Sequence, residues 1–572
     1  MADTVAAAPP GAPAPAPQQE GVDPRRWIAL WVVLTAAFMV LLDISIVNVA
    51  IPSIQRNLGA SFAQIQLVLA GYQLAYAVVL ITGGRLGDIF GRKRLFMTGM
   101  AGFILASASC GFAQNADMLV ISRVVQGVMA ALMYPQVLST IQVVFPPHER
   151  PAAFGTFGAV IGVATIAGPL LGGVLIGSAT ATERWRWVFL VNLPVGIAAL
   201  TAAWFLLRES RAPRARRLDI AGVLIVSAAL GLLTYPLVEG RDQGWPGWSF
   251  VMMAASVPAF ALFVWYERVK SRRDGSPLVE LSMFRDRAFS AGNALSAVFL
   301  SAIPSFFLIF SITLQIGLGF SPLRTGLTTV PWALGTAVSS AVSVRLAPRL
   351  GKRILYAGCL MLALGVCGVI LTIHQRGNGL DGPELIPALV WSGLGMGCII
   401  APLTNIILAS ISQGDAGAAA GVLTTMQQVG GAIGVAVVGV IFFGLLGARA
   451  DSASASVVPQ LRSELAAQHL PAAQVDGAVQ GFRVCFHDRA NQSDPSATPP
   501  SCARLQQGSA PKAVRAAFQR ASTQALGQVF VQSVERSLLY PIGVFLVSFL
   551  LVFAIPRPAR REALPAAGAA AH

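Results

Sequence analysis

The chain alternates between long apolar runs and short polar connections. A helix needs about 20 mostly apolar residues to cross roughly 30 Å of hydrocarbon. Fourteen runs approach or exceed that length, over residues 28–51, 63–83, 95–113, 117–144, 154–177, 187–207, 219–238, 250–266, 291–314, 326–344, 354–373, 386–411, 417–447 and 537–555. The pattern predicts an all-α integral membrane protein with 14 transmembrane helices.

The composition excludes a soluble protein of ordinary kind. Of 572 residues, 55% are hydrophobic and 12% charged, and the mean hydropathy is +0.66. Soluble domains carry about a quarter charged residues. The formal charge is +15, from 41 basic and 26 acidic residues, which in a soluble protein would suggest a nucleic-acid partner.

The distribution of the basic residues predicts the topology instead. If the amino terminus is inside, the cytoplasmic connections and tails hold 25 Arg and Lys and the short outer loops hold 6. Short loops rich in Arg and Lys stay in the cytoplasm, and long loops such as 448–536 do not count. We therefore expect a multi-pass protein of the cell membrane, with both termini cytoplasmic and no nucleic-acid partner.

A loose internal repeat indicates two related halves. Residues 84–93 (GRLGDIFGRK) align with residues 344–353 (VRLAPRLGKR) at an offset of 260. Recurrence of Gly and basic residues at cytoplasmic loops is the alternative explanation. If the repeat is genuine, the organisation is a disordered tail (1–24), a six-helix half (25–208), two inserted helices (209–268), helices 9–13 (269–447), a long extracytoplasmic loop (448–536), helix 14 (537–556) and a cytoplasmic tail (557–572).

Two charged residues lie deep within the apolar runs. Asp43 is the only carboxylate that the pattern places well inside a span, and burial favours its protonation near neutral pH. Arg123 cannot discharge itself, so it needs a partner or a wet cavity. We hypothesise that Arg123 tunes Asp43 directly or through Gln126. Alternatively, Asp43 is a structural carboxylate and Arg123 satisfies backbone carbonyls.

Two glycine-rich segments complete the candidate motifs. Gly84, Gly87 and Gly91 permit a tight turn after span two, with Asp88 placed to pair with an Arg or to cap the next helix. Alternatively, this segment is a basic loop that only sets the topology. Span five has small residues and a proline where helices could pack closely and kink, at Gly158, Gly162, Gly168, Pro169, Gly172 and Gly173.

These strings, in this order, resemble the fourteen-helix drug/proton antiporters of the major facilitator superfamily, which include multidrug and quaternary-ammonium exporters. The resemblance covers about residues 25–447 and 537–556. It is carried by 42–52 (LDISIVNVAIP), 84–94, 123–127 (RVVQG), the span-five glycines and 185–194 (WRWVFLVNLP). It implies alternating access, proton coupling at Asp43, Arg123 and Gln126, and a latch at Gly84, Asp88, Gly91 and Arg92 that closes in the outward-facing state. It links Gly158, Gly162, Gly168, Pro169 and Gly172 to antiport.

The resemblance also bears on substrate and cofactor. Extra acids in the carboxy-terminal half favour dications in this family, and spans nine to fourteen have none well inside the membrane. We expect amphipathic, monocationic or neutral small molecules, contacted by Tyr72, Gln73, Tyr76, Phe306, Phe307, Trp332, Gln427 and Gln428. The proton gradient would drive export, without cofactor or metal, in a monomer embedded in the lipid bilayer.

Other functions have less support in the residues. No HExxH, plausible GxSxG or Walker sequence is present, so we expect no enzyme and no direct ATP drive. A dedicated exporter of one metabolite or lipid and a transport-inactive membrane receptor stay open. In the long outer loop, Cys485 and Cys502 are expected to form a disulfide, since disulfides persist in that compartment. Residues 511–536 are expected to form an amphipathic helix.

Overall fold

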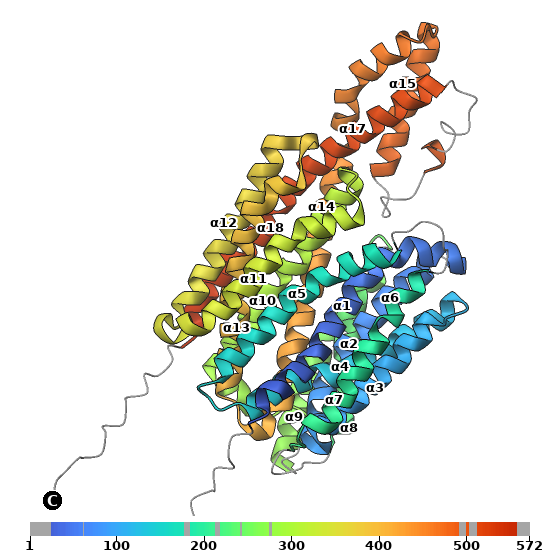
Figure 1. Ribbon diagram of the computed structural model, residues 1–572. Helices are drawn as coiled ribbons and strands as arrows, with labels where there is room; N and C mark the ends of the chain where they lie inside the picture. The colour runs from blue at the N-terminus through green and yellow to red at the C-terminus, as the bar shows by residue number, and fades with distance from the viewer. Residues whose placement is uncertain are drawn as a thin grey trace, which may run out of the picture.

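The protein is a bundle of long helices from which a smaller helical unit projects (Figure 1). The computed structural model describes residues 24–60, 62–176, 184–211, 218–240, 243–273, 277–490, 499–502 and 512–556, and these contain no β-strand. Nearly all of the predicted tails at 1–24 and 557–572 therefore lie outside the described residues.

The first half of the bundle is formed by six apolar segments of the chain. They are α1 (Arg26–Leu58), α2 (Phe62–Phe90), α3 (Arg92–Gly111), α4 (Ala116–Val144), α5 (Arg150–Ile176), and the short α6 (Trp187–Leu190) that leads into α7 (Asn192–Leu206). In Figure 1 these helices, blue to cyan, lie together on one side of the bundle.

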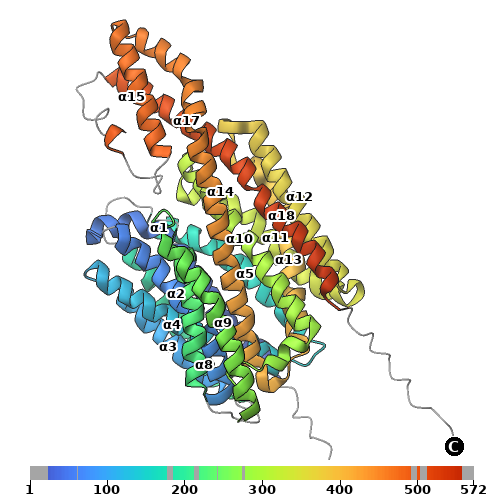
Figure 2. The same ribbon diagram turned by 180° about the vertical axis from the view of Figure 1, so that it is seen from behind.

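The second half is built from six helices that follow the two helices predicted as an insertion. The inserted pair is α8 (Ile220–Glu239) and α9 (Gly247–Arg273), and the half comprises α10 (Arg287–Ile312), α11 (Pro322–Leu350), α12 (Arg353–Arg376), α13 (Ile386–Ala409), α14 (Ala416–Ala466) and α18 (Leu539–Leu551). Helix α8 packs against α2 and α14, one helix from each half, so the inserted pair lies at the seam between the halves (Figure 2).

Twelve segments of the described chain are long and apolar enough to cross a membrane. Helices α3 and α5 are not among them, so the count of fourteen spans stays a prediction, while the all-helical membrane fold is confirmed. The repeat at an offset of 260 has a structural counterpart. Gly91 and Gly351 both have a positive φ, 110° and 54°, and each separates two long helices. Glycine adopts this backbone without steric cost.

Glycines let the helices approach closely, because hydrocarbon supplies no hydrophobic drive for helix association. A Cβ at Gly127 of α4 would lie 2.3 Å from the Tyr72 carbonyl oxygen of α2. A Cβ at Gly434 of α14 would lie 1.8 Å from the Ser301 carbonyl oxygen of α10. Neither position accepts a side chain without moving a neighbouring helix.

The segment predicted as a long loop is largely helical. Helix α14 continues to Ala466, well past the apolar run that ends at residue 447, and α15 (Ala472–Ala490) and α17 (Lys512–Ser537) follow. The helix expected over 511–536 corresponds to α17, which leads directly into α18. Cys485 and Cys502 are joined by a disulfide. We call the end of the bundle from which these helices project the projecting end (Figure 1).

The opposite end carries the first and last described residues. Arg26 at the start of α1 donates two hydrogen bonds to Glu149, just before α5. Lys352 Nζ, at the start of α12, donates to the carbonyl of Ile555, just after α18. Both ends of the described chain thus lie at the end remote from α15 and α17 (Figures 1 and 2).

Candidate functional site

Asp43 of α1 and Arg123 of α4 form an ion pair in the interior of the first half. Both side chains are fully buried, and Arg123 Nη1 donates to Asp43 Oδ2. Gln126 lies one helical turn after Arg123, so it faces the same way. Its Nε2 donates to Asp43 Oδ1 at 3.0 Å, and its Oε1 accepts from Arg123 Nη1 at 2.9 Å. The structure brings the three predicted residues together.

The pair is surrounded by further partners on three other helices. Arg123 Nε donates to the Val68 carbonyl at 3.2 Å, and the Tyr72 ring lies 4.1 Å beneath the guanidinium. Asn192 Nδ2 of α7 donates to Asp43 Oδ1 at 3.2 Å and to Ser107 Oγ of α3 at 3.1 Å. Such bonds offset the cost of removing two charges from water, whereas loss of one partner would leave a buried charge uncompensated.

Asn192 was not predicted as a functional residue, although it stands in the string at 185–194. An amide within an apolar run was the only available signal. The network thus combines one carboxylate, one guanidinium and two amides in a part of the fold shielded from water.

The predicted latch residues meet the other half at the end remote from α15 and α17, which we call the latch end. Asp88, buried near the end of α2, accepts from the backbone amides of Gly417 at 3.1 Å and Ala418 at 3.0 Å, in the first turn of α14. A helix amino terminus favours a carboxylate because its first amides are unpaired and its dipole is positive there. Arg92 Nη2 donates to Asp88 Oδ1 at 2.5 Å and to the Gln413 carbonyl at 2.8 Å.

The turn expected over Gly84 to Gly91 is narrower than predicted. Helix α2 continues to Phe90, so Gly84 and Gly87 lie within it and only Gly91 forms the turn. The helical glycines serve close contact. A Cβ at Gly84 would lie 2.1 Å from the Gly417 carbonyl oxygen, across the two halves. Because α2 is longer than its apolar run, Asp88 lies on a helix and not on a loop.

Other polar side chains join the halves at the latch end. Gln142 of α4 donates to the Leu408 carbonyl of α13 at 2.5 Å. Arg85 Nη1 lies 3.8 Å from Asp415 Oδ1, and Arg85 Nη2 donates to the Pro277 carbonyl at 3.2 Å. The halves are therefore bonded to each other at this end of the bundle.

The glycines of α5 serve two interfaces. Gly158 and Gly162 face α11 of the other half, where a Cβ would lie 2.9 Å from Ser340 Oγ and 3.3 Å from the Ala333 carbonyl oxygen, respectively. Gly168 faces α1 of its own half, where a Cβ would lie 2.3 Å from Ser45 Oγ. Gly172 is buried. Pro169 lies within α5, and its side chain is outside the described part. Helix α5 thus touches both halves through small residues.

The residues expected to contact a substrate fall into two groups. In the second half, the Trp332 ring stacks on Phe306 at 5.0 Å and meets Phe307 edge-on at 5.1 Å. Gln427 Nε2 donates to Ser296 Oγ at 3.2 Å. In the first half, Tyr72 and Tyr76 stack at 6.1 Å, and both are buried, whereas Gln73 of the same helix is exposed.

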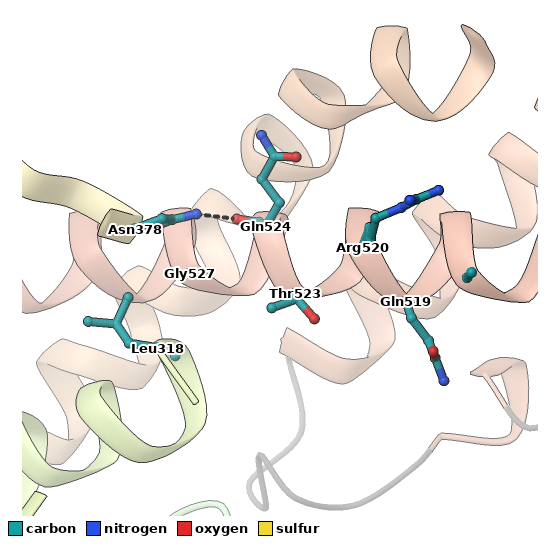
Figure 3. Close-up of a pocket in the computed structure, with 9 residues that line it drawn as sticks. Leu318, Asn378, Gln519, Arg520, Thr523, Gln524 and Gly527 are labelled. Carbon is teal, nitrogen blue, oxygen red and sulfur yellow. Dashed lines mark hydrogen bonds between the residues drawn. The ribbon is translucent and has the colours of Figure 1, made fainter. Parts of the chain in front are cut away.

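Gln428 connects the two groups. Its side chain, on α14, lies close enough to that of Tyr76 on α2 to interact with it electrostatically. A pocket of about 530 Å³ lies elsewhere, at the projecting end between α17 and the turns that follow α10 and α12, and none of the expected residues lines it. Figure 3 shows its polar wall, where Asn378 Nδ2 donates to the Gln524 carbonyl at 3.0 Å.

Comparison with known proteins places this arrangement in a family. The sequence profile of the Major Facilitator Superfamily matches residues 33–435. The chain is 42% identical over 539 residues to the "Probable actinorhodin transporter" of Streptomyces coelicolor, covering 94% of this chain and 93% of that one. It is 36% identical to the "Puromycin resistance protein pur8" of Streptomyces alboniger, covering 82% and 89%.

Another relative agrees with this placement, and two solved structures share the fold. The "Tetracenomycin C resistance and export protein" of Streptomyces glaucescens is 35% identical, with 75% and 78% covered. A bacterial homologue of the human lysosomal transporter Spinster has the same fold, with a TM-score of 0.54 at 15% identity and 94% and 98% covered. The human organic anion transporter MFSD10 also has a TM-score of 0.54, at 14% identity, with 92% and 99% covered.

Proposed function

Because this chain belongs to the major facilitator superfamily, a family of membrane transporters, we propose that it is a proton-coupled antiporter for drug efflux. In this proposal it exports amphipathic, monocationic or neutral small molecules across the cytoplasmic membrane. The names of its relatives support the efflux part: they refer to a probable actinorhodin transporter, to puromycin resistance, and to tetracenomycin C resistance and export.

The buried pair of Asp43 and Arg123 is the observation that carries proton coupling. Protonation of Asp43 removes its charge and frees Arg123, so the first half has two electrostatic states with different internal bonds. A substrate that favours one state and a proton that favours the other exchange across the membrane. Gln126 and Asn192 hold the acid in both states, whether or not it carries the proton.

The proposal also includes a role for the latch in the transport cycle. We take the latch end as cytoplasmic, in accord with the charge distribution of the short connections, and the projecting end as external. The bonds of Asp88, Arg92 and Gln142 then close the cytoplasmic side, which corresponds to a state open to the outside. Breaking them would admit cargo from the cytoplasm.

The charges of the second half bear on the cargo. Among the described residues, the buried acids are Asp43, Asp88, Asp219, Glu239 and Glu267, and none belongs to α10–α14 or α18. A dication bound at the aromatic group of Phe306, Phe307 and Trp332 would find no compensating carboxylate there.

The proton gradient supplies the free energy for this exchange. One proton exchanged for a neutral substrate would gain about 2.3 kcal/mol per 100 mV of membrane potential and about 1.4 kcal/mol per unit of pH difference.

A dedicated exporter of one compound is the second candidate. The relative at 42% identity is named for a single compound, and it matches nearly the full length of both chains. The two candidates share the proton site and differ in the range of molecules carried.

Transport in everted membrane vesicles tests the proposal. A panel of fluorescent amphipathic cations and neutral antibiotics is offered with the pH gradient intact or collapsed. We expect gradient-dependent uptake into these vesicles, lost in Asp43→Asn and kept in Asp451→Asn, a change at a carboxylate 78% exposed. Uptake by Asp43→Asn at the unmodified rate would refute proton coupling at this site. Uptake of only one compound would favour the dedicated exporter.

A further inference from the structure

Two carboxylates outside the Asp43 network lie buried at the latch end. Asp219 immediately precedes α8, and Glu267 lies near the end of α9, so the inserted pair of helices supplies both. The sequence pattern did not reveal them as buried, because each stands at the edge of an apolar run, where charged residues usually meet water. In the structure Glu267 is fully buried and Asp219 is 4% exposed.

Each carboxylate has one satisfied oxygen and one without a partner. Glu267 Oε2 accepts from the Val279 amide at 3.0 Å, and Asp219 Oδ1 accepts from the Gly222 amide and the Tyr266 hydroxyl. Within the described part of the chain, Glu267 Oε1 and Asp219 Oδ2 have no hydrogen-bond partner. A buried carboxylate oxygen without a donor costs free energy, which a bound proton would relieve.

The two unpartnered oxygens converge on one point. A Cβ built on Gly222 would lie 2.6 Å from Glu267 Oε1 and 2.9 Å from Asp219 Oδ2. The oxygens are therefore at most about 5.5 Å apart, a range in which one carboxylate charge opposes ionisation of the other.

Arg85 connects this pair with the latch. It is buried on α2, its Nε has no partner among the residues that the structure describes, and it acts electrostatically on Glu267. It also bonds the Pro277 carbonyl and lies 3.8 Å from Asp415, next to the start of α14. Among the described residues, the charged and titratable groups that act on the pair or on Arg85 are Arg85 itself, Tyr266, Lys270 and Asp415.

We propose that Asp219 and Glu267 share one bound proton, and that Arg85 links this second proton site to the latch. Two carboxylates beside one guanidinium carry a net charge of −1, and one proton brings the group to neutrality. If α2 moves and carries Arg85 away from the pair, Asp219 and Glu267 bind the proton more strongly, because the positive charge of Arg85 no longer repels it. By linkage, a proton on the pair then favours an open latch.

Infrared titration of the purified full chain in lipid nanodiscs tests this assignment. Asp43→Asn is the parent, so the outcome does not depend on the proton site in the proposed function. We expect the parent to show the C=O absorption of a protonated carboxyl near neutral pH. Glu267→Gln and Asp219→Asn should each abolish it, since an amide can donate to the one remaining carboxylate. Asp451→Asn should keep it, and Arg85→Gln should move its midpoint to higher pH.

Three results would overturn the proposal. One is a parent without the absorption, which means that both carboxylates are ionised. Another is an absorption that survives both Glu267→Gln and Asp219→Asn, which places the proton elsewhere. The third is loss in only one of the two variants, which gives the proton to a single carboxyl. Each variant is compared with the parent by thermal unfolding, so that a misfolded sample is recognised before titration.

Discussion

Replacement of Asp88 by Asn should weaken the latch without removing a side chain. The carboxylate accepts the Gly417 and Ala418 amides of the other half and also pairs with Arg92. Hydrogen bonds to a charged group contribute about 1.5–3 kcal/mol each. Asn keeps one uncharged acceptor, so we expect a loss of about 2–3 kcal/mol across the halves. That corresponds to a roughly 30- to 150-fold shift toward an open latch end.

Distances between the halves measure this shift directly. Spin labels are attached at His148→Cys and Arg353→Cys, two exposed positions at the latch end on opposite halves, with the exposed Cys367 changed to Ser. Double electron–electron resonance should give a longer distance population in Asp88→Asn. Asp415→Asn is the matched control, since its pair with Arg85 is 3.8 Å long and partly exposed and should contribute at most about 1 kcal/mol. Equal distance distributions in Asp88→Asn and the unmodified latch would refute the reasoning.

Three further changes probe other parts of the molecule. Asn192→Ala removes a hydrogen-bond donor to Asp43, so it should lower the free energy of unfolding by about 1 kcal/mol and slow gradient-driven uptake. Thermal unfolding and vesicle transport measure the two effects, and an unchanged transport rate would contradict a role for Asn192 in positioning Asp43. The double variant Cys485→Ala/Cys502→Ala should lower the local free energy of unfolding of the projecting helices by about 3 kcal/mol and leave the membrane bundle intact. The projecting helices should then be cleaved faster by a protease, and equal protease sensitivity would count against this. The Arg324 hydrogen bond holds the pKa of Asp381 below its usual value of 3.8, so this contact stabilises above that pH and is lost as the pH falls through the lowered pKa. Arg324→Gln should therefore raise the pKa of Asp381, which infrared titration of the carboxyl group would measure. An unchanged pKa would show that Arg324 does not lower it.

Residues that break the apolar pattern could be recognised from the sequence, and residues at its edges could not. Asp43 and Arg123 were visible because each interrupts an apolar run, and they do meet. Asn192 is uncharged, so it carried little signal within its run. Asp219 and Glu267 stand at run boundaries, where an exposed carboxylate is the ordinary expectation.

Helix lengths were underestimated for the same reason. Hydropathy marks where a helix contacts hydrocarbon, whereas the helix itself continues as long as backbone geometry and packing allow. Helix α2 reaches Phe90 and α14 reaches Ala466, both beyond their apolar runs. The contacts of Asp88 with α14 depend on this extension, so the latch geometry required coordinates. The aromatic residues Phe306 and Trp332 were predicted individually, but their stacking depends on the crossing of α10 and α11.

The 51 residues of α14 form one helix about 76 Å long, with Pro459 near its far end. Its first turn supplies the amides that Asp88 binds, and its far end is tied to α17 by Arg520 and Glu464. A tilt of about 10° at the first turn would swing the far tip by roughly 13 Å. If the projecting end is external, as proposed above, a nanobody bound to α15 and α17 would report or restrict the movement of the latch from outside the cell.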